Sequence, residues 1–220
     1  MRTIAAPGGD ELTVPPADNP AAFGAGHAST YAAGAHRQVP GYTDLHRMTS
    51  LLLGERVGTH GTVLVVGAGG GLELKALADD HPDWPFTGVD PSADMLREAA
   101  ALLQAHAARI SLRQGFVDAA PVGPFDGATC LLTLHFVPRE HRLDMLREIR
   151  RRLVPGGPFV VAHISFPQSE PERSKWIARH VAFGGTEPAR AEAARNAIAT
   201  RLSILSPEED EALLRQAGFS

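Results

Sequence analysis

A glycine-rich loop is the feature of this sequence whose residue types and spacing point most directly to chemistry. The stretch VLVVGAGGGLELKALA covers residues 63–78, and four of the five residues from 67 to 71 are glycine. Because glycine has no Cβ, such a loop lets the backbone approach a ligand closely. A tight turn without a ligand is the alternative, but four glycines exceed what a turn requires. We therefore expect a ligand at the end of the apolar run that precedes the loop.

An aspartate indicates that this ligand contains a nucleoside. Asp90 ends the next apolar stretch, FTGVD, where a carboxylate can accept hydrogen bonds from both hydroxyls of a ribose. The dinucleotide fingerprint G-x-G-x-x-G requires a third glycine where this chain has Leu72, and the observed spacing is G-x-G-x-G. These residues alone leave the class of nucleoside open.

Short apolar runs alternate with amphipathic segments through the middle of the chain. This alternation predicts βαβ units, and therefore an α/β fold with a parallel sheet and helices on both faces. Ser92 is expected to cap the helix after the second strand. Ser206 is expected to begin a last helix that Gly218 ends. The expected strands cover residues 62–66, 86–90, 109–114, 125–134 and 158–165, and a helix is expected over 138–153.

Composition limits the classes of function. The chain has 220 residues and a formal charge of -4, which favours a small-molecule partner and gives no electrostatic basis for binding nucleic acid. The single cysteine, Cys130, excludes an intrachain disulfide and is expected to be a packed thiol. The histidines form no metal-ligand cluster, so we expect no metal. Without a signal peptide or an apolar stretch of about 18 residues, we expect a cytoplasmic protein without membrane contact.

Four motifs, in this order, resemble those of class I S-adenosylmethionine-dependent methyltransferases. They are VLVVGAGGG, GVDPSADML, FDGATCLLTLHFV and LREIRRRLVPGG, and LLRQAGF near the end extends the likeness. The resemblance covers about residues 23–165 and 206–219. It implies a Rossmann-like, mostly parallel, doubly wound sheet. It also implies S-adenosylmethionine as the cofactor.

The resemblance also implies roles for single residues. The glycine loop would approach the methionine part of the cofactor, and Asp90 would hold its ribose. Pro91, Met95 and the segment at Val117 and Asp118 would contact the adenine, and the N-terminal cover would touch the methionine carboxylate. The implied cofactor-binding residues are Tyr31, Arg37, Gly67, Ala68, Gly69, Asp90, Pro91, Met95, Val117, Asp118 and Thr133.

Two residues depart from the family pattern on the cofactor side. Many relatives carry an acid at the position of Val65, where it helps with the cationic methionine end of the cofactor. Family members often carry another acid at the position of Phe116, directly after the glycine that follows the third strand. With Val65 in place of the acid one favourable charge is lost, so we expect weaker cofactor binding. With Phe116 in place of the other acid, Asp118 or the backbone of Val117 has to reach the edge of the adenine.

His135 is the candidate catalytic base. It follows the fourth strand, where the family places residues that face cofactor and acceptor, and histidine can take a proton at neutral pH. The alternative is a histidine bonded to the backbone at the strand end. His163, at the end of the fifth strand, is a second candidate.

The expected organisation has four parts. Residues 1–40 form a flexible tail and cofactor cover, 41–165 the cofactor-binding core, 166–205 a helical cover over the acceptor site, and 206–220 a final core helix. In the cover, Trp176, Phe166 and Phe183 are expected either to line an apolar acceptor pocket or to pack against the core.

The C-terminal β-hairpin of the family is missing after QAGFS, which leaves the fifth strand as an open sheet edge. A shortened product, a homodimer or other partner chain, and the N-terminal arm of the chain itself are the competing explanations. The predicted function is methyl transfer to a hydroxyl or amine of a small, largely apolar molecule. The alternative is a non-catalytic cofactor-binding or assembly subunit with the same fold.

Overall fold

Five parallel strands form the sheet at the centre of the computed structural model, which describes residues 34–220. Their order is β3-β2-β1-β4-β5, and every neighbouring pair is parallel. The chain order reverses between β1 and β4, which is where ligands bind in open sheets of this kind. The strands are β1 (Val63–Val66), β2 (Phe86–Asp90), β3 (Ile110–Gln114), β4 (Gly127–Leu131) and β5 (Phe159–Ala162).

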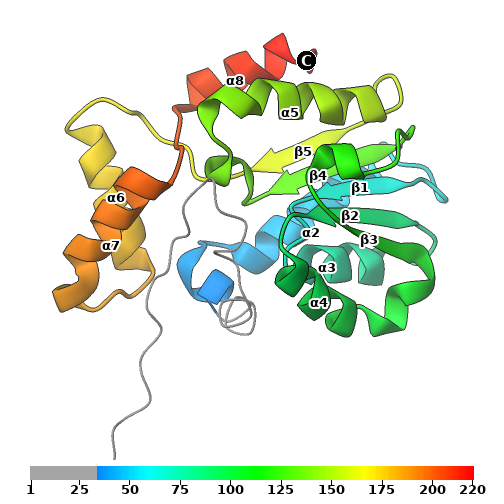
Figure 1. The fold of residues 1–220 in the computed structure, drawn as a ribbon, viewed down its shortest axis with the longest axis horizontal. Helices are drawn as coiled ribbons and strands as arrows, with labels where there is room; N and C mark the ends of the chain where they lie inside the picture. The colour runs from blue at the N-terminus through cyan, green and yellow to red at the C-terminus, as the bar shows by residue number, and fades with distance from the viewer. Residues whose placement is uncertain (1–33) are drawn as a thin grey trace, which may run out of the picture.

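Helices cover both faces of this sheet (Figure 1). One face carries α2 (Tyr42–Gly54), α3 (Leu72–Asp80) and α4 (Ala93–Leu102), and the other carries α5 (Arg139–Arg152) and α8 (Pro207–Gln216). Alternate residues of β1 enter two different clusters: Val63 and Val65 pack with the first set, Leu64 and Val66 with the second. A strand buried on both faces must be apolar throughout, which explains its sequence. The predicted doubly wound α/β fold is confirmed.

The two helices predicted within residues 166–205 lie beyond the carboxyl ends of the strands (Figure 1). They are α6 (Glu172–Phe183) and α7 (Pro188–Arg201), joined through Gly184 and Gly185. They share a small core of their own, formed by Phe166, Ile177, Val181, Ala194 and Ile198. This helix pair is therefore a separate packing unit beside the edge of the sheet where the glycine loop lies.

The predicted helix caps are present. The Ser92 hydroxyl accepts a hydrogen bond from the Met95 N–H at 3.3 Å. Ser206 accepts from the Glu209 N–H at 3.3 Å, and the Glu209 carboxylate accepts from the Ser206 N–H at 3.0 Å, which completes a capping box. Gly218 follows the last helix with a φ of 93°. None of the helices in the described part of the chain is long and apolar enough to cross a membrane.

The fourth and fifth strands are half as long as their apolar runs predicted. The fourth was expected over 125–134 but ends at Leu131, because Leu132 adopts a left-handed φ of 54° and a 3-10 turn, η4 (Leu134–Phe136), follows. Leu134 remains buried, so hydrophobicity alone could not show the break. The fifth was expected over 158–165 and ends at Ala162. Within residues 34–220, β5 is an edge strand and the sheet contains no antiparallel strand.

Candidate active site

The glycine loop joins β1 to α3 at the carboxyl edge of the sheet. Gly67, Gly69 and Gly71 have φ angles of 79°, 50° and 85°, in the left-handed region that favours glycine. The backbone N–H groups of Gly67 and Ala68 both donate to the carbonyl of Val89 in β2, each at 2.9 Å. The loop is therefore fixed against the neighbouring strand.

Asp90 is fixed to this loop by its carboxylate. Its Oδ2 accepts from the Gly69 N–H at 2.9 Å, and its Oδ1 accepts from the Ser92 N–H at 2.8 Å. Burial raises the pKa of Asp90, and the two backbone hydrogen bonds lower it. A carboxylate has about four acceptor sites, so two remain for hydroxyl donors of a ligand. The structure thus brings together the glycine loop and Asp90, which were predicted to bind a nucleoside-containing ligand.

Thr133 packs directly on the glycine loop. A Cβ placed on Gly67 would lie 2.0 Å from Thr133 Oγ1, so only glycine fits there. The Thr133 hydroxyl donates to the carbonyl of Leu131 at 2.9 Å, which turns the chain at the end of β4. The loops after β1 and β4 therefore meet at the point where the strand order reverses.

The residues predicted to contact adenine follow β2 and β3. The two segments are joined by the Gly115 N–H, which donates to the Asp90 carbonyl at 3.0 Å. Met95 and Val117 are buried, and the Phe116 side chain is 66% exposed. Pro91 is half-buried and Asp118 is exposed. Their contacts with a base stay predictions.

The N-terminal predictions are only partly covered by the structure. Tyr31 lies outside the described residues. Arg37 is exposed on a helical turn over residues 34–38. Its role toward the carboxylate of the cofactor stays a prediction.

His135 lies in η4 and is buried. The backbone N–H of Ile164 donates to its Nδ1 at 3.3 Å. Burial holds the pKa of His135 well below its usual value, and the neighbouring His163, Arg142 and His180 lower it further. A neutral imidazole that accepts at Nδ1 carries its hydrogen on Nε2. This arrangement makes Nε2 a hydrogen-bond donor.

A buried ion pair that sequence reasoning missed lies next to the two histidines. The Arg142 side chain is fully buried, and its Nη1 donates to Asp210 Oδ1 at 2.9 Å. Its remaining nitrogens donate to the carbonyls of Val137 and Ser203. His163 Nε2 lies 3.4 Å from Asp210 Oδ2; burial lowers the pKa of His163, and the Asp210 carboxylate only partly opposes this shift. The network ties α8 to α5 and to the chain beyond β5.

Sequence reasoning also missed Glu73, in the first turn of α3. Its side chain is buried and its Oε1 has no hydrogen-bond partner among the described residues. Burial raises its pKa to about 7, and the Thr129 hydroxyl lowers it. The spacing offered a signal, because Glu73 falls on the same helix face as the buried Leu77. An acid within that apolar face is unusual unless it is paired or used.

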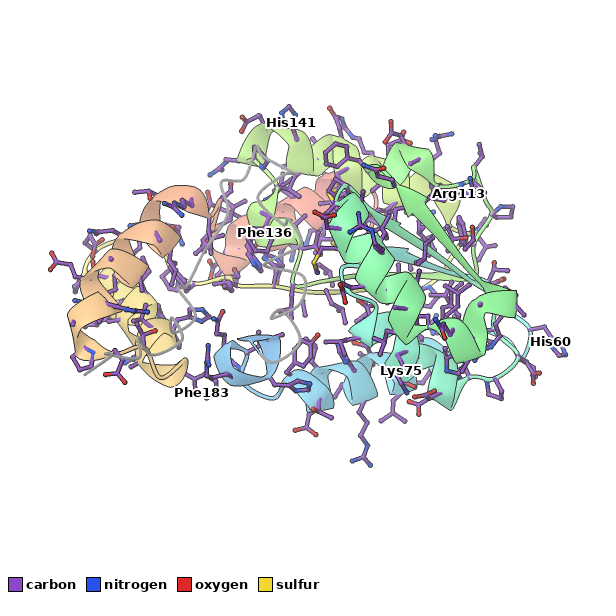
Figure 2. The ribbon with its side chains drawn as sticks, turned by 60° about the horizontal axis from the view of Figure 1, so that its bottom comes forward. His60, Lys75, Arg113, Phe136, His141 and Phe183 are labelled. Atoms are coloured by element: carbon purple, nitrogen blue, oxygen red, sulfur yellow. The ribbon has the colours of Figure 1, made fainter. Side chains whose placement is uncertain are left out.

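The aromatic residues of the cover divide by burial. Phe166 packs inside the cluster of α6 and α7. Trp176 and Phe183 are 42% and 53% exposed, and the Arg179 guanidinium lies 4.8 Å from the centroid of the Trp176 ring. Figure 2 shows Phe183 at the end of α6, and Phe136 between the sheet and the helix pair. Among residues 34–220 no group of three or more His, Cys, Asp or Glu could hold a metal ion.

Comparison with known proteins identifies the family. Residues 63–157 match the family model described as a methyltransferase domain. The carboxy-S-adenosyl-L-methionine synthase of Ectopseudomonas mendocina is 28% identical over 195 residues, which cover 84% of this chain and 79% of that protein. The chain carries a class I S-adenosylmethionine-dependent methyltransferase domain.

One further relative and one solved structure of the same fold extend the comparison. The trans-aconitate 2-methyltransferase of Rhodopseudomonas palustris is 32% identical over 127 residues, 55% of this chain and 44% of that protein. The Haemonchus contortus phosphoethanolamine N-methyltransferase 2, solved with S-adenosyl-L-methionine, shares the fold with a TM-score of 0.64 at 16% identity. That alignment covers 89% of this chain and 42% of the other. The cofactor is S-adenosylmethionine.

The described residues fit this cofactor. Asp90 retains acceptor sites for a ribose diol and is fixed within hydrogen-bond distance of the glycine loop. The loop lies where the strand order reverses, and at its glycines no side chain blocks the approach of a ligand to the backbone. The bound cofactor supplies an electrophilic methyl group on a sulfonium, and the protein has to position it and keep water away.

Proposed function

We propose that this methyltransferase transfers the methyl group to an oxygen or nitrogen atom of a small, largely apolar acceptor. The acceptor binds between the carboxyl edge of the sheet and the helices α6 and α7. The observation that carries the proposal is the place of the glycine loop and Asp90 at that edge, which α6 and α7 face (Figure 1). The acceptor lone pair forms the new bond to the methyl carbon as the carbon–sulfur bond breaks, which leaves S-adenosylhomocysteine, and the proton of the methylated oxygen or nitrogen passes to solvent.

In this proposal His135 contacts the acceptor molecule, but as a hydrogen-bond donor and not as the base that the sequence predicted. The sequence predicted a base, but the Ile164 N–H occupies Nδ1 and the depressed pKa keeps the ring neutral. The Nε2–H can then hold the acceptor by a hydrogen bond and cannot remove its proton. Positioning of this kind is a large part of catalysis of a displacement reaction.

Substitution of His135 separates these two roles. His135→Ala is expected to lower kcat by about tenfold or more, through lost positioning. His135→Gln keeps an N–H donor and an acceptor on one side chain, so it is expected to retain most of the activity. The pH dependence of kcat should keep its shape in both variants. If Gln is as inactive as Ala and an inflection of the pH profile disappears, His135 is the base after all.

Binding of S-adenosylhomocysteine tests the cofactor site. Asp90→Ala removes the only predicted ribose acceptor, and we expect calorimetric titration to show affinity about 10- to 100-fold weaker, as for a lost hydrogen bond to a charged group. Asp80→Ala, at the exposed end of α3, is the matched control and should bind like the wild type. Equal affinity of the Asp90 variant and the wild type would contradict the assignment of Asp90 as the residue that binds the ribose hydroxyls.

The named relatives raise a second candidate, which acts on the cofactor itself. The protein from E. mendocina bears the name of a carboxy-S-adenosyl-L-methionine synthase. Mass spectrometry of the cofactor after turnover distinguishes the two. Methyl transfer leaves S-adenosylhomocysteine, whereas carboxylation, which requires a carboxyl donor in the assay, leaves a cofactor in which a carboxyl group has replaced one hydrogen. Binding without either product would support the non-catalytic subunit. Pairing of β5 with a second chain, and a cytoplasmic location, stay predictions.

A further inference from the structure

Two buried polar side chains face each other between α3 and β4. Glu73 comes from the first turn of α3, and Thr129 from the middle of β4. The Thr129 side chain is fully buried and Glu73 is 7% exposed. Glu73 Oε1 and Thr129 Oγ1 both have no hydrogen-bond partner within residues 34–220. A buried carboxyl group with an unpartnered oxygen lowers the stability of the folded chain, and a ligand that donates a hydrogen bond to this oxygen would account for it.

The position of this carboxyl relates it to the glycine loop. Thr129 lies in register with Val65 of β1, and Val65 packs with Leu74 of α3. In-register neighbours in a parallel sheet share a face, so Val65, Thr129 and the Glu73 carboxyl lie on the same side. Val65 comes two residues before Gly67, and Glu73 two residues after Gly71. The carboxyl is thus held at the base of the loop that the cofactor approaches.

No cation among residues 34–220 contributes to the pKa of this carboxyl. The Thr129 hydroxyl and burial are the influences on its pKa, and the Cys130 thiol is the titratable group coupled to it. Burial and Glu73 raise the pKa of Cys130 and Arg142 lowers it, and the thiol stays neutral; an ionised thiol would carry the same negative charge as Glu73 and could not balance it. A desolvated carboxylate gains most from a ligand cation that donates hydrogen bonds.

We propose that Glu73 receives the ammonium group of the methionine part of S-adenosylmethionine. The cofactor has two cationic centres, and only the ammonium carries N–H donors that can satisfy Glu73 Oε1. Glu73 thereby supplies from α3 the negative charge that Val65 does not supply from β1. This proposal rests on the cofactor assignment and goes beyond it by naming the residue that binds the amino-acid end.

A pair of ligands isolates the amino-acid end of the cofactor, which carries the ammonium and a carboxylate. S-Adenosylhomocysteine has the amino-acid end, whereas 5′-methylthioadenosine has the same nucleoside and a thioether but no ammonium. At pH 8, Glu73→Gln is expected to weaken binding of S-adenosylhomocysteine about tenfold or more in calorimetric titrations, as for a lost charge-assisted hydrogen bond. It should leave the affinity for 5′-methylthioadenosine unchanged. Asp90→Ala should weaken both ligands alike.

The pH dependence adds a second readout. The affinity of the wild type for S-adenosylhomocysteine should rise with pH up to about 7 and level off above it, because Glu73 must be ionised to bind the ammonium. The Gln variant should lack this rise, and 5′-methylthioadenosine should show none with either protein.

Three results would overturn the proposal. One is equal weakening of both ligands by Glu73→Gln. Another is unchanged binding of S-adenosylhomocysteine. If the wild type binds neither ligand, the cofactor site itself fails, and that outcome is distinct from the first two. Retained binding of 5′-methylthioadenosine by the Gln variant shows that the variant is folded.

Discussion

Replacing Asp210 with alanine is expected to lower the free energy of unfolding by about 3–5 kcal/mol, because it leaves a buried arginine without its charge partner. Arg142 is fully buried, and Asp210 is 7% exposed. Burial lowers the pKa of Arg142, and the Asp210 carboxylate raises it. The contacts of Arg142 with the carbonyls of Val137 and Ser203 satisfy its N–H groups but bring no opposite charge.

Urea unfolding at pH 7.5, followed by circular dichroism, measures this loss. Glu211 on the same helix is the matched control, since its pair with Arg215 is 63% and 70% exposed. Glu211→Ala should cost less than about 1 kcal/mol, because exposed ion pairs contribute little. If Asp210→Ala costs as little stability as Glu211→Ala, water or a neighbouring group compensates the charge of Arg142. The double substitution Arg142→Met with Asp210→Leu should recover much of the stability, because it buries no charge.

The fold was predictable because its signals are local or periodic. The apolar run of β1 implies burial on both faces, and the cluster membership of its alternate residues shows that burial. The caps at Ser92 and Ser206 depend on residues within three positions. The glycine loop and Asp90 were found together because the carboxyl ends of neighbouring parallel strands share one edge.

The rest depends on contacts between distant residues. The pairing of Arg142 with Asp210 joins positions 68 residues apart, and the helical pattern around Arg142 gives no sign of it. The break after Leu131 depends on the backbone at Leu132, whose apolar side chain suits either conformation. A positive φ at a non-glycine residue costs about 1–3 kcal/mol, and such residues cluster at functional sites. The strained residue Leu132 directly precedes the loop that contains Thr133 and His135.

The role of His135 shows a limit of another kind. The sequence proposes His135 as a candidate, but the chemistry open to its ring depends on which nitrogen is occupied. That is decided by the Ile164 N–H, 29 positions away. Residue type therefore predicts a candidate, and the hydrogen-bond partner decides whether the ring can take up a proton or only donate a hydrogen bond.

The second large effect is expected from Glu73→Gln, which should stabilise the protein by about 3 kcal/mol at pH 8 and leave it unchanged near pH 4.5. The pKa of Glu73 is about 7 in the folded chain, against an ordinary value of 4.5. Between these values the folded state binds more protons than the unfolded state, so the unfolding free energy of the wild type falls as pH rises and levels off above 7. Glutamine cannot ionise, and its curve lacks this fall.

Urea unfolding of both proteins across this pH range tests the expectation, because the shifts of other groups cancel in the difference. Glu172 lies in the first turn of α6 as Glu73 lies in the first turn of α3, but it is solvated and paired with Lys175, so Glu172→Gln should show no such gain at high pH. Parallel curves for wild type and Glu73→Gln would mean that Glu73 is solvated or paired. A gain in stability together with weaker binding of S-adenosylhomocysteine is the combination that a purely structural glutamate does not produce, since a structural residue would lose stability on substitution.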